Sequence, residues 1–221
     1  MRLLPSDTMT DVVFTWTSHG KEQTRVLHAH DKMSSREALG LWKVDNRAWK
    51  VYATTSQLKA LTDDYTRAQV DGGLPVGTPT PSFQVGTVKQ GEKTETHGFV
   101  LIAQWMSGTN FQKTAAKFRS ALAKEDVPKE KDSQDYDRFA PSSMMQGVAR
   151  TAKLMPLHRI VKGCAGANEV GLRDCQGYIK TGISEPIRFV DVHTSWNPQT
   201  RKYGHSGQAQ QLVDTIAAWG K

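Results

Sequence analysis

Alternating apolar and polar residues mark paired strands in the first half of the chain. Residues 11–18 (DVVFTWTS) and 22–30 (EQTRVLHAH) alternate on either side of a short turn, so they predict a hairpin. A second hairpin is predicted from residues 83–89 and 94–105. The end of the latter segment, GFVLIAQW, is almost entirely apolar, which is typical of a central strand covered on both faces.

The segment LWKVDNRAWKVY, residues 41–52, predicts a third hairpin that turns at Asp45-Asn46 or at Asn46-Arg47. Side chains alternate along a strand, so the two faces of this hairpin differ. We expect one face to pack into a core with each tryptophan opposite a valine, and it carries Trp42, Val44, Trp49 and Val51. The opposite face carries Lys43, Lys50 and Tyr52.

Apolar residues that recur every three or four positions predict four helices. These cover residues 54–70, 109–125, 142–155 and 207–220. The third is expected to stop at Pro156, because proline cannot donate the backbone hydrogen bond that a helix interior requires. Residues 34–42 predict at most two further helical turns.

The remaining segments predict two strands and several loops. The strands are expected at residues 177–183 and 186–194. Glycine, proline or charge dominates the segments that we expect to be loops, which are residues 72–82, 126–143, 163–177 and 196–207.

Adjacent strand pairs followed by helices indicate an α+β fold, in which an antiparallel sheet built from hairpins carries packed helices and long Gly/Pro and charged loops. At 221 residues the chain is expected to form a single α+β domain spanning residues 1–221. A division near residues 126–141, into 1–125 and 142–221, is the alternative that the charged loop suggests.

Composition adds a basic charge to this picture. Hydrophobic residues make up 38% of the chain and charged residues 23%, which is globular rather than disordered. The net charge of +7 and the sequence pI near 9.4 favour encounter with polyanions. No secretory leader and no membrane-spanning apolar run is evident, so we expect a cytoplasmic protein with no membrane partner.

Three groups of cations, two of them with aromatic residues, are candidate nucleic-acid contacts. Cations can bind phosphates, and aromatic rings can stack on unpaired bases. The first group lies in the segment 41–52, the second beside the glycine-rich segment, and the third in the polar loop near the C-terminus. Their members are Lys43, Arg47, Lys50 and Tyr52; Arg150, Lys153, Arg159 and Lys162; and Trp196, Arg201, Lys202 and Tyr203.

Catalytic and metal-binding motifs are sparse. His28 and His30 are expected to project to one side of a strand, where they could chelate a metal, but no third-ligand motif such as HExxH accompanies them. The glycine-rich stretch from residue 163 fits neither phosphate-loop pattern, although it could lie near a polyanion. Cys164 and Cys175 lack the CxxC spacing of a zinc site and are expected to be ordinary thiols.

These patterns predict a non-enzymatic nucleic-acid-binding protein, a subunit of a larger RNA- or DNA-handling complex that contacts single-stranded or guide-type nucleic acid through basic loops. Its expected partners are RNA or single-stranded DNA together with other protein subunits, and no cofactor is expected. Two alternatives stay open: a structural or assembly protein of a phage or secretion-type machine, and a metal-dependent hydrolase or nuclease that uses His28 and His30.

Overall fold

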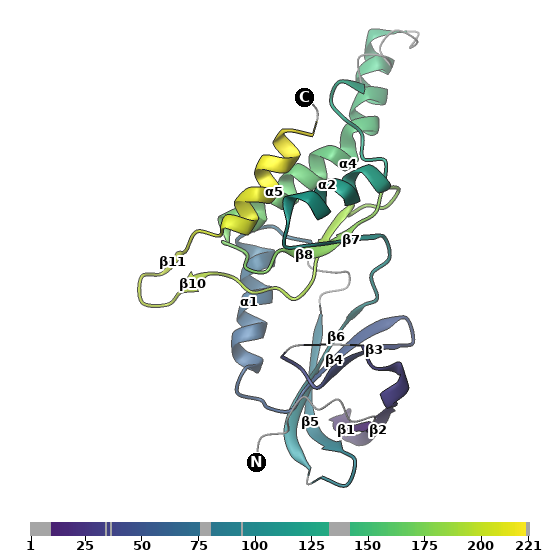
Figure 1. Cartoon of the computed structure of the whole chain (residues 1–221), viewed down its shortest axis with the longest axis vertical. Coiled ribbons are helices and arrows are strands. Elements are labelled where there is room, and N and C mark those ends of the chain that lie inside the picture. Colours follow the sequence, from purple (N-terminus) through teal and green to yellow (C-terminus); the bar gives the residue numbers. More distant parts are fainter. Residues whose placement is uncertain are drawn as a thin grey trace. The chain divides into compact units, whose positions relative to one another are not determined.

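The computed structural model describes residues 10–33, 35, 37–75, 81–93, 95–132 and 142–219. These residues form helices, one six-stranded antiparallel sheet and smaller sheets, which confirms the predicted α+β class (Figure 1). The chain divides into two compact units, Met1–Thr62 with Gly77–Met106 and Asp63–Val76 with Ser107–Lys221. The domain organisation expected from the sequence stays a prediction, and each unit is described by itself.

The first unit is built on a curled antiparallel sheet of three hairpins. The strand order is β2-β1-β5-β6-β4-β3, and the apolar strand β6 lies between β5 and β4, as its composition predicts. All three predicted hairpins are therefore confirmed. The strands are β1 (Val12–Ser18), β2 (Lys21–Leu27), β3 (Gly40–Val44), β4 (Arg47–Tyr52), β5 (Ser82–Gln90) and β6 (Thr96–Gln104).

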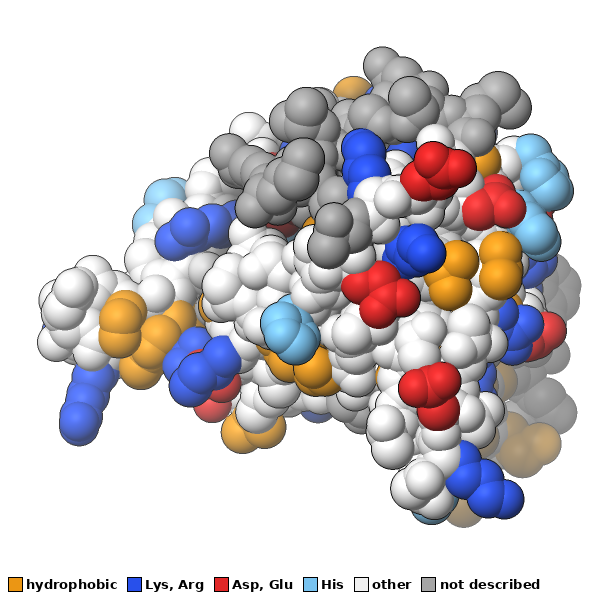
Figure 2. Space-filling view, turned by 90° about the horizontal axis from the view of Figure 1, so that it is seen from below, with side chains coloured by type: hydrophobic (Ala, Val, Ile, Leu, Met, Phe, Trp, Pro, Cys, Tyr) orange, Lys and Arg blue, Asp and Glu red, His pale blue; other side chains and the backbone are white. Residues whose placement is uncertain are grey.

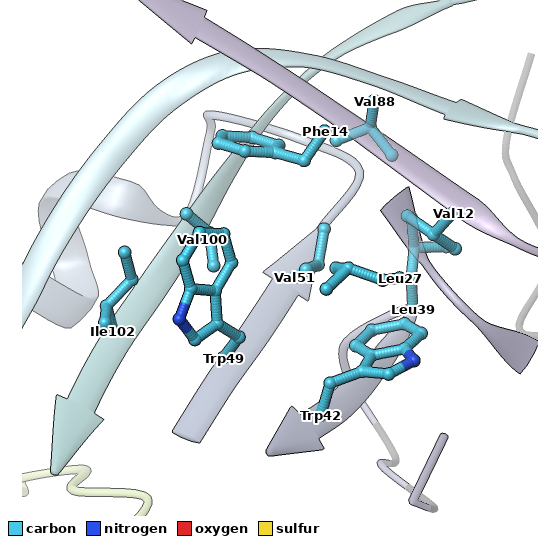
Figure 3. Close-up of a cluster of buried hydrophobic side chains, with 10 residues drawn as sticks. All are labelled: Val12, Phe14, Leu27, Leu39, Trp42, Trp49, Val51, Val88, Val100 and Ile102. Atoms are coloured by element: carbon cyan, nitrogen blue, oxygen red, sulfur yellow. The ribbon is translucent and has the colours of Figure 1, made fainter. Parts of the chain in front are cut away.

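One face of this sheet encloses an apolar core in which Trp42 and Phe14 are fully buried (Figure 3). The indole Nε1 of Trp42 donates to the carbonyl oxygen of His28 at 2.9 Å, so its only polar group is satisfied. The ring of Trp16 packs edge-to-face against that of Trp49, with centroids 5.7 Å apart. The tryptophans of the β3–β4 hairpin are thus core residues, as expected.

Two details of the first unit correct the sequence-based expectations. The helical turns predicted over residues 34–42 are wrong for the described part of that segment, because strand β3 already begins at Gly40. A short 3₁₀ turn, η1 (Ala29–Asp31), lies earlier in the chain. The predicted tryptophan–valine pairs are also wrong: Trp42 lies opposite Trp49. This register follows from a two-residue turn at Asp45 and Asn46, both of which have positive φ.

The second unit combines a three-stranded antiparallel sheet, in the order β7-β8-β9, with helices α2, α4 and α5. The rings of Phe111, Phe118 and Phe189 meet edge-to-face in its core. Residues of α1 (Leu58–Val70) from Asp63 onward also belong to this unit. The other elements are β7 (Thr109–Gln112), α2 (Ala115–Lys124), α4 (Ser143–Glu169), β8 (Gln176–Ile179), β9 (Ile187–Phe189), β10 (Trp196–Asn197), β11 (Lys202–Tyr203) and α5 (Gly207–Ala217).

Helix α4 is the largest departure from the predicted elements, because it continues through Pro156 to Glu169. Proline removes one backbone donor, but the helix buries Leu154, Leu157 and Ile160 on its inner face, and this packing holds it on both sides of the proline. The glycine-rich segment is therefore helical over its first half.

Two further predictions need correction in this unit. The predicted helix over 109–125 begins only after β7, because Lys113 has a positive φ and the Thr114 side chain caps α2 by accepting from the Lys117 amide. The polar loop 196–207 instead contains the short β10–β11 hairpin, in which Trp196 lies opposite Tyr203.

Parts of the two predicted surface loops, residues 76–80 and 133–141, lie outside the described residues. Among the helices that are described, none combines the length and the apolar character that a bilayer crossing requires.

Candidate nucleic-acid interface

The outer face of the β3–β4 hairpin brings cations and an aromatic ring together. Because side chains alternate, Lys43 and Lys50 point away from the tryptophan core, as predicted. The ammonium of Lys43 lies 5.4 Å from the centroid of the Trp105 ring, and Lys50 lies 5.6 Å from that of Tyr52. Cation–π contacts at exposed positions contribute about 0.5–1 kcal/mol, enough to bias where each ammonium sits.

Tyr52 does not offer its ring to a ligand, which corrects the expectation that it could stack on a base. It is 1% exposed, and its ring stacks on Phe99 with centroids 4.5 Å apart. The partly exposed aromatic ring beside Lys43 is that of Trp105, which the sequence analysis did not identify as a candidate. Its amide donates to the carbonyl oxygen of Asn46 at 3.1 Å, which fixes the half-buried indole beside the hairpin turn.

The charges at the tip of the hairpin are divided between a paired and an exposed cation. Arg25 from β2 contacts the Asp45 carboxylate at 3.1 Å and lies over the Trp49 ring. Arg47 is exposed, and among the described residues it makes no ion pair. The carboxylate at the tip is therefore neutralised, and the net charge of the hairpin surface is positive.

The four predicted cations on α4 do not form one track. Residues nine positions apart in an α-helix are two and a half turns apart and lie on opposite faces, which separates Arg150 from Arg159 and Lys153 from Lys162. The Lys153 ammonium donates to the carbonyl oxygen of Asp132 at 2.7 Å. Helix α4 is consequently a poor match for a single polyanion strand.

The glycine-rich segment serves close packing rather than an anion cradle. Glycines are required where the backbone of another element approaches too closely for a Cβ atom. Such an atom would crowd a neighbour at four positions: Gly163 against Ile187, Gly166 against Gly72, Gly171 against Ser195 and Gly177 against Arg188.

The aromatic residues of the β10–β11 hairpin are occupied by contacts within the unit. Trp196 is half-buried, with the Arg67 guanidinium 5.0 Å from its ring and the Tyr203 ring 5.0 Å away. The Tyr203 hydroxyl donates to the Asp71 carboxylate. Burial, followed by this hydrogen bond, raises the pKa of the Tyr203 phenol above its ordinary value. These rings stabilise the hairpin and leave little surface for a base.

Exposed cations elsewhere are mixed with carboxylates. Arg201 and Lys202 of the β10–β11 hairpin are exposed and make no ion pair among the described residues. On the face of the molecule in Figure 2, however, Lys and Arg side chains lie interspersed with Asp and Glu, and no broad area has a single sign. The outer face of the hairpin, with Lys43 and Lys50, is the best-defined basic group; Arg47 projects from the opposite face at the tip.

His28 and His30 lie side by side but not on a strand, because β2 ends at Leu27 and His30 belongs to the 3₁₀ turn. Their rings stack with centroids 5.4 Å apart. The Nδ1 atom of His28 lies 3.1 Å from the Asp11 carboxylate, and the Asp31 carboxylate contacts the His30 ring. Within the described part of the chain, no group of three or more His, Cys, Asp and Glu residues could hold a metal ion.

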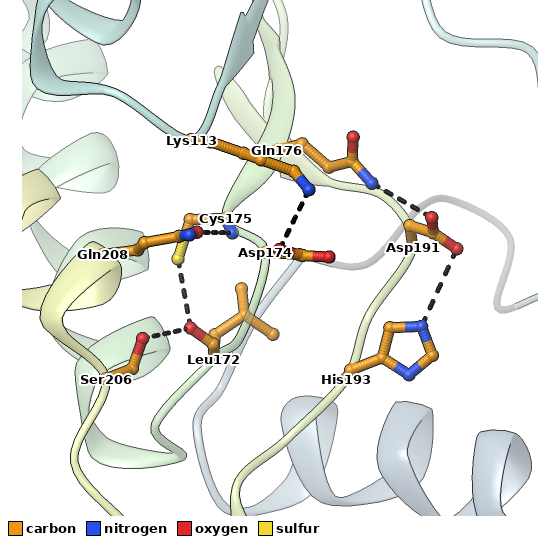
Figure 4. A network of polar contacts seen from close by, with 9 residues as sticks. All are labelled: Lys113, Leu172, Asp174, Cys175, Gln176, Asp191, His193, Ser206 and Gln208. Atoms are coloured by element: carbon orange, nitrogen blue, oxygen red, sulfur yellow. Dashed lines mark hydrogen bonds and ion pairs between the residues drawn. The ribbon is translucent and has the colours of Figure 1, made fainter. Parts of the chain in front are cut away.

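A polar cluster around His193 was not anticipated from the sequence (Figure 4 shows part of it). Its Nδ1 and Nε2 atoms each lie 3.9 Å from a carboxylate, that of Asp64 and that of Asp191 respectively. Gln176 donates to Asp191 at 3.1 Å, and Thr194 donates to Asp64, from which it is separated by 130 positions. Both ring nitrogens face protein carboxylates, so the cluster joins segments of the unit that are distant in sequence.

The two cysteines are free and buried. Burial, and then the charge of Asp174, raise the pKa of the Cys175 thiol to about 12. Its Sγ donates to the carbonyl oxygen of Leu172 at 3.2 Å. Burial also raises the pKa of Cys164, so both are structural thiols rather than nucleophiles, as the sequence suggested.

Comparison of the chain with models of known protein families, with curated proteins and with solved structures finds no match.

Proposed function

We propose that this protein binds a single strand of nucleic acid, RNA or DNA, through the outer face of the β3–β4 hairpin, as a non-enzymatic subunit of a larger complex. The observation that carries the proposal is that Lys43 and Lys50 share the outer face of the two-stranded hairpin, each held over an aromatic ring.

The chemistry of this surface favours a polyanion. The five side chains on the outer face of the hairpin, Leu41, Lys43, Ala48, Lys50 and Tyr52, include no carboxylate. Each phosphate that a lysine or arginine neutralises releases condensed counterions, which makes binding favourable and salt-dependent. The net charge of +7 adds a long-range attraction for the same ligand.

Trp105 supports a single strand rather than a duplex. Unpaired bases stack on aromatic rings, whereas the bases of a duplex are already stacked on one another. One side of the indole is covered by Lys43, so a base would reach the ring at its remaining exposed surface while the lysine contacts an adjacent phosphate. This arrangement reads no base edges, and we expect weak sequence preference.

Fluorescence anisotropy with labelled 20-nucleotide poly(dT) and poly(U), measured from low to high salt, tests the proposal. Two phosphate contacts to a single strand, from Lys43 and Lys50, predict a plot of log K against log salt with a slope of about −1.4. A slope near zero, or no binding of either oligonucleotide at low salt, would exclude the proposal. A preference between the two oligonucleotides would decide between RNA and DNA.

A further inference from the structure

The first three turns of α4 lack the core contacts that hold the rest of the helix. From Ser142 to Lys153, no side chain that is described is buried, and Leu154 is the first buried residue. Met144 is 80% exposed and Val148 66% exposed. Large apolar side chains exposed to this degree on one element are typical of an interaction surface.

Three of the exposed apolar residues of α4 form a stripe that ends in two cations, while Met145 and Val161, which are also exposed, lie outside it. At about 100° per residue, five side chains fall within an arc of about 60°, namely Met144, Val148, Met155, Arg159 and Lys162. The buried residues Leu157, Ile160 and Cys164 lie on the opposite side of the same helix. The helix is thus apolar on two faces, and only one of them is covered by its own unit.

Charge on α4 indicates what covers the other face. Arg159 and Lys162 are exposed at the C-terminal end of the stripe, and the only acidic residue of the helix is its last, Glu169. The Arg159 guanidinium donates to the carbonyl oxygen of Ser184, which orients it without neutralising its charge. A partner that suits the stripe must offer apolar side chains at one end and carboxylates at the other.

We propose that α4 docks an acidic amphipathic helix from another protein along this stripe. The stripe spans 19 residues, from Met144 to Lys162, over about 27 Å, so it accommodates a helix of about five turns. Apolar side chains of the partner pack on Met144, Val148 and Met155, where the unbranched methionines adapt to their shape. Its carboxylates pair with Arg159 and Lys162. A second copy of α4 carries one carboxylate, that of Glu169 at its last residue, and none within the stripe.

A pair of designed peptides tests this inference on the full chain. Both are labelled 18-residue amphipathic helices with the same leucine face; one carries glutamate and the other lysine beside that face. We expect the acidic peptide to bind at least tenfold more tightly than the basic one. Val148→Asp should weaken it at least tenfold, and the double variant R159E/K162E should reverse the preference in favour of the basic peptide.

Arg150→Glu is the control, because it reverses one cation on the opposite face of the helix and should leave the preference for the acidic peptide intact. Circular dichroism and thermal melting establish that each variant is folded.

Equal binding of the two peptides, or no effect of Val148→Asp, overturns the inference. Self-association in light scattering that Val148→Asp abolishes assigns the stripe to a second copy, and binding only to anionic vesicles assigns it to a membrane. Either result also overturns the inference. The oligonucleotide surface on the β3–β4 hairpin is a separate site, so failure of one leaves the other standing.

Discussion

The backbone of Gly72, just after α1, packs directly against Gly166 in α4. A Cβ atom on Gly166 would overlap the carbonyl oxygen of Gly72, and a Cβ atom on Gly72 would lie 2.9 Å from the carbonyl oxygen of Gly166. Backbone atoms cannot rotate away as a flexible side chain can. This contact therefore requires glycine at position 166.

We expect Gly166→Ala to destabilise the second unit by about 1–3 kcal/mol, the usual cost of overpacking a site that cannot relax. Gly147→Ala is the matched control on the same helix, because a Cβ atom there meets nothing within 4 Å. Alanine has the higher helix propensity, so this variant should be stabilised by about 0.5–1 kcal/mol. Urea unfolding followed by circular dichroism measures both, and two changes of the same sign would refute the packing role.

The two thiols give a second prediction. With its pKa raised to about 12, the Cys175 thiol is ionised in about one molecule in 10⁴ at pH 8, and burial raises the pKa of Cys164 as well. Ellman's reagent should find no reactive thiol in the folded protein and two in 8 M urea. Rapid reaction of either thiol in the native state would show that the core of the second unit opens readily.

The hairpins of the first unit were predictable because strand alternation and turn chemistry are local signals. The pattern of residues 41–52 places Lys43 and Lys50 on one face whichever elements pack around them. The pattern could not identify Trp105 as their neighbour, because that contact depends on β6 pairing with β4 across the sheet.

The errors around α4 arise where tertiary packing overrides a local signal. Pro156 disfavours a helix interior, and glycine is a poor helix former, yet both lie inside α4. The burial of Leu157 and Ile160 offsets the lost hydrogen bond, and Gly166 permits the approach of Gly72. The cluster of Asp64 and His193 was unpredictable for a related reason: no local spacing connects residues so distant in sequence.

Alkaline pH provides a test of the Tyr203–Asp71 hydrogen bond. Burial and this bond raise the folded-state pKa of the phenol above its ordinary value of 10.0, so the folded chain retains the proton where the unfolded chain loses it. The resulting stability is complete below pH 10 and declines as the pH rises through the folded-state pKa. Tyr203→Phe lacks this contribution. Its deficit in unfolding free energy should be largest near pH 7 and should shrink above pH 10, as measured by urea titrations from pH 7 to 11. Parallel curves for the two proteins would show that the bond does not contribute.

Lysine and tryptophan variants of the hairpin surface separate two contributions to oligonucleotide binding. The double variant K43Q/K50Q removes two phosphate contacts, so the slope of log K against log salt should fall in magnitude by about 1.4. Trp105→Leu removes a stacking surface worth about 1–3 kcal/mol, which corresponds to about 5- to 150-fold in affinity, but leaves the charges in place. It should therefore weaken binding with an unchanged slope. Lys21→Gln, an exposed lysine on β2, is the control and should leave binding close to that of the unmodified protein. If Lys21→Gln lowers the slope by half as much as the double variant and Trp105→Leu leaves the affinity unchanged, binding depends on net charge alone and the hairpin has no special role.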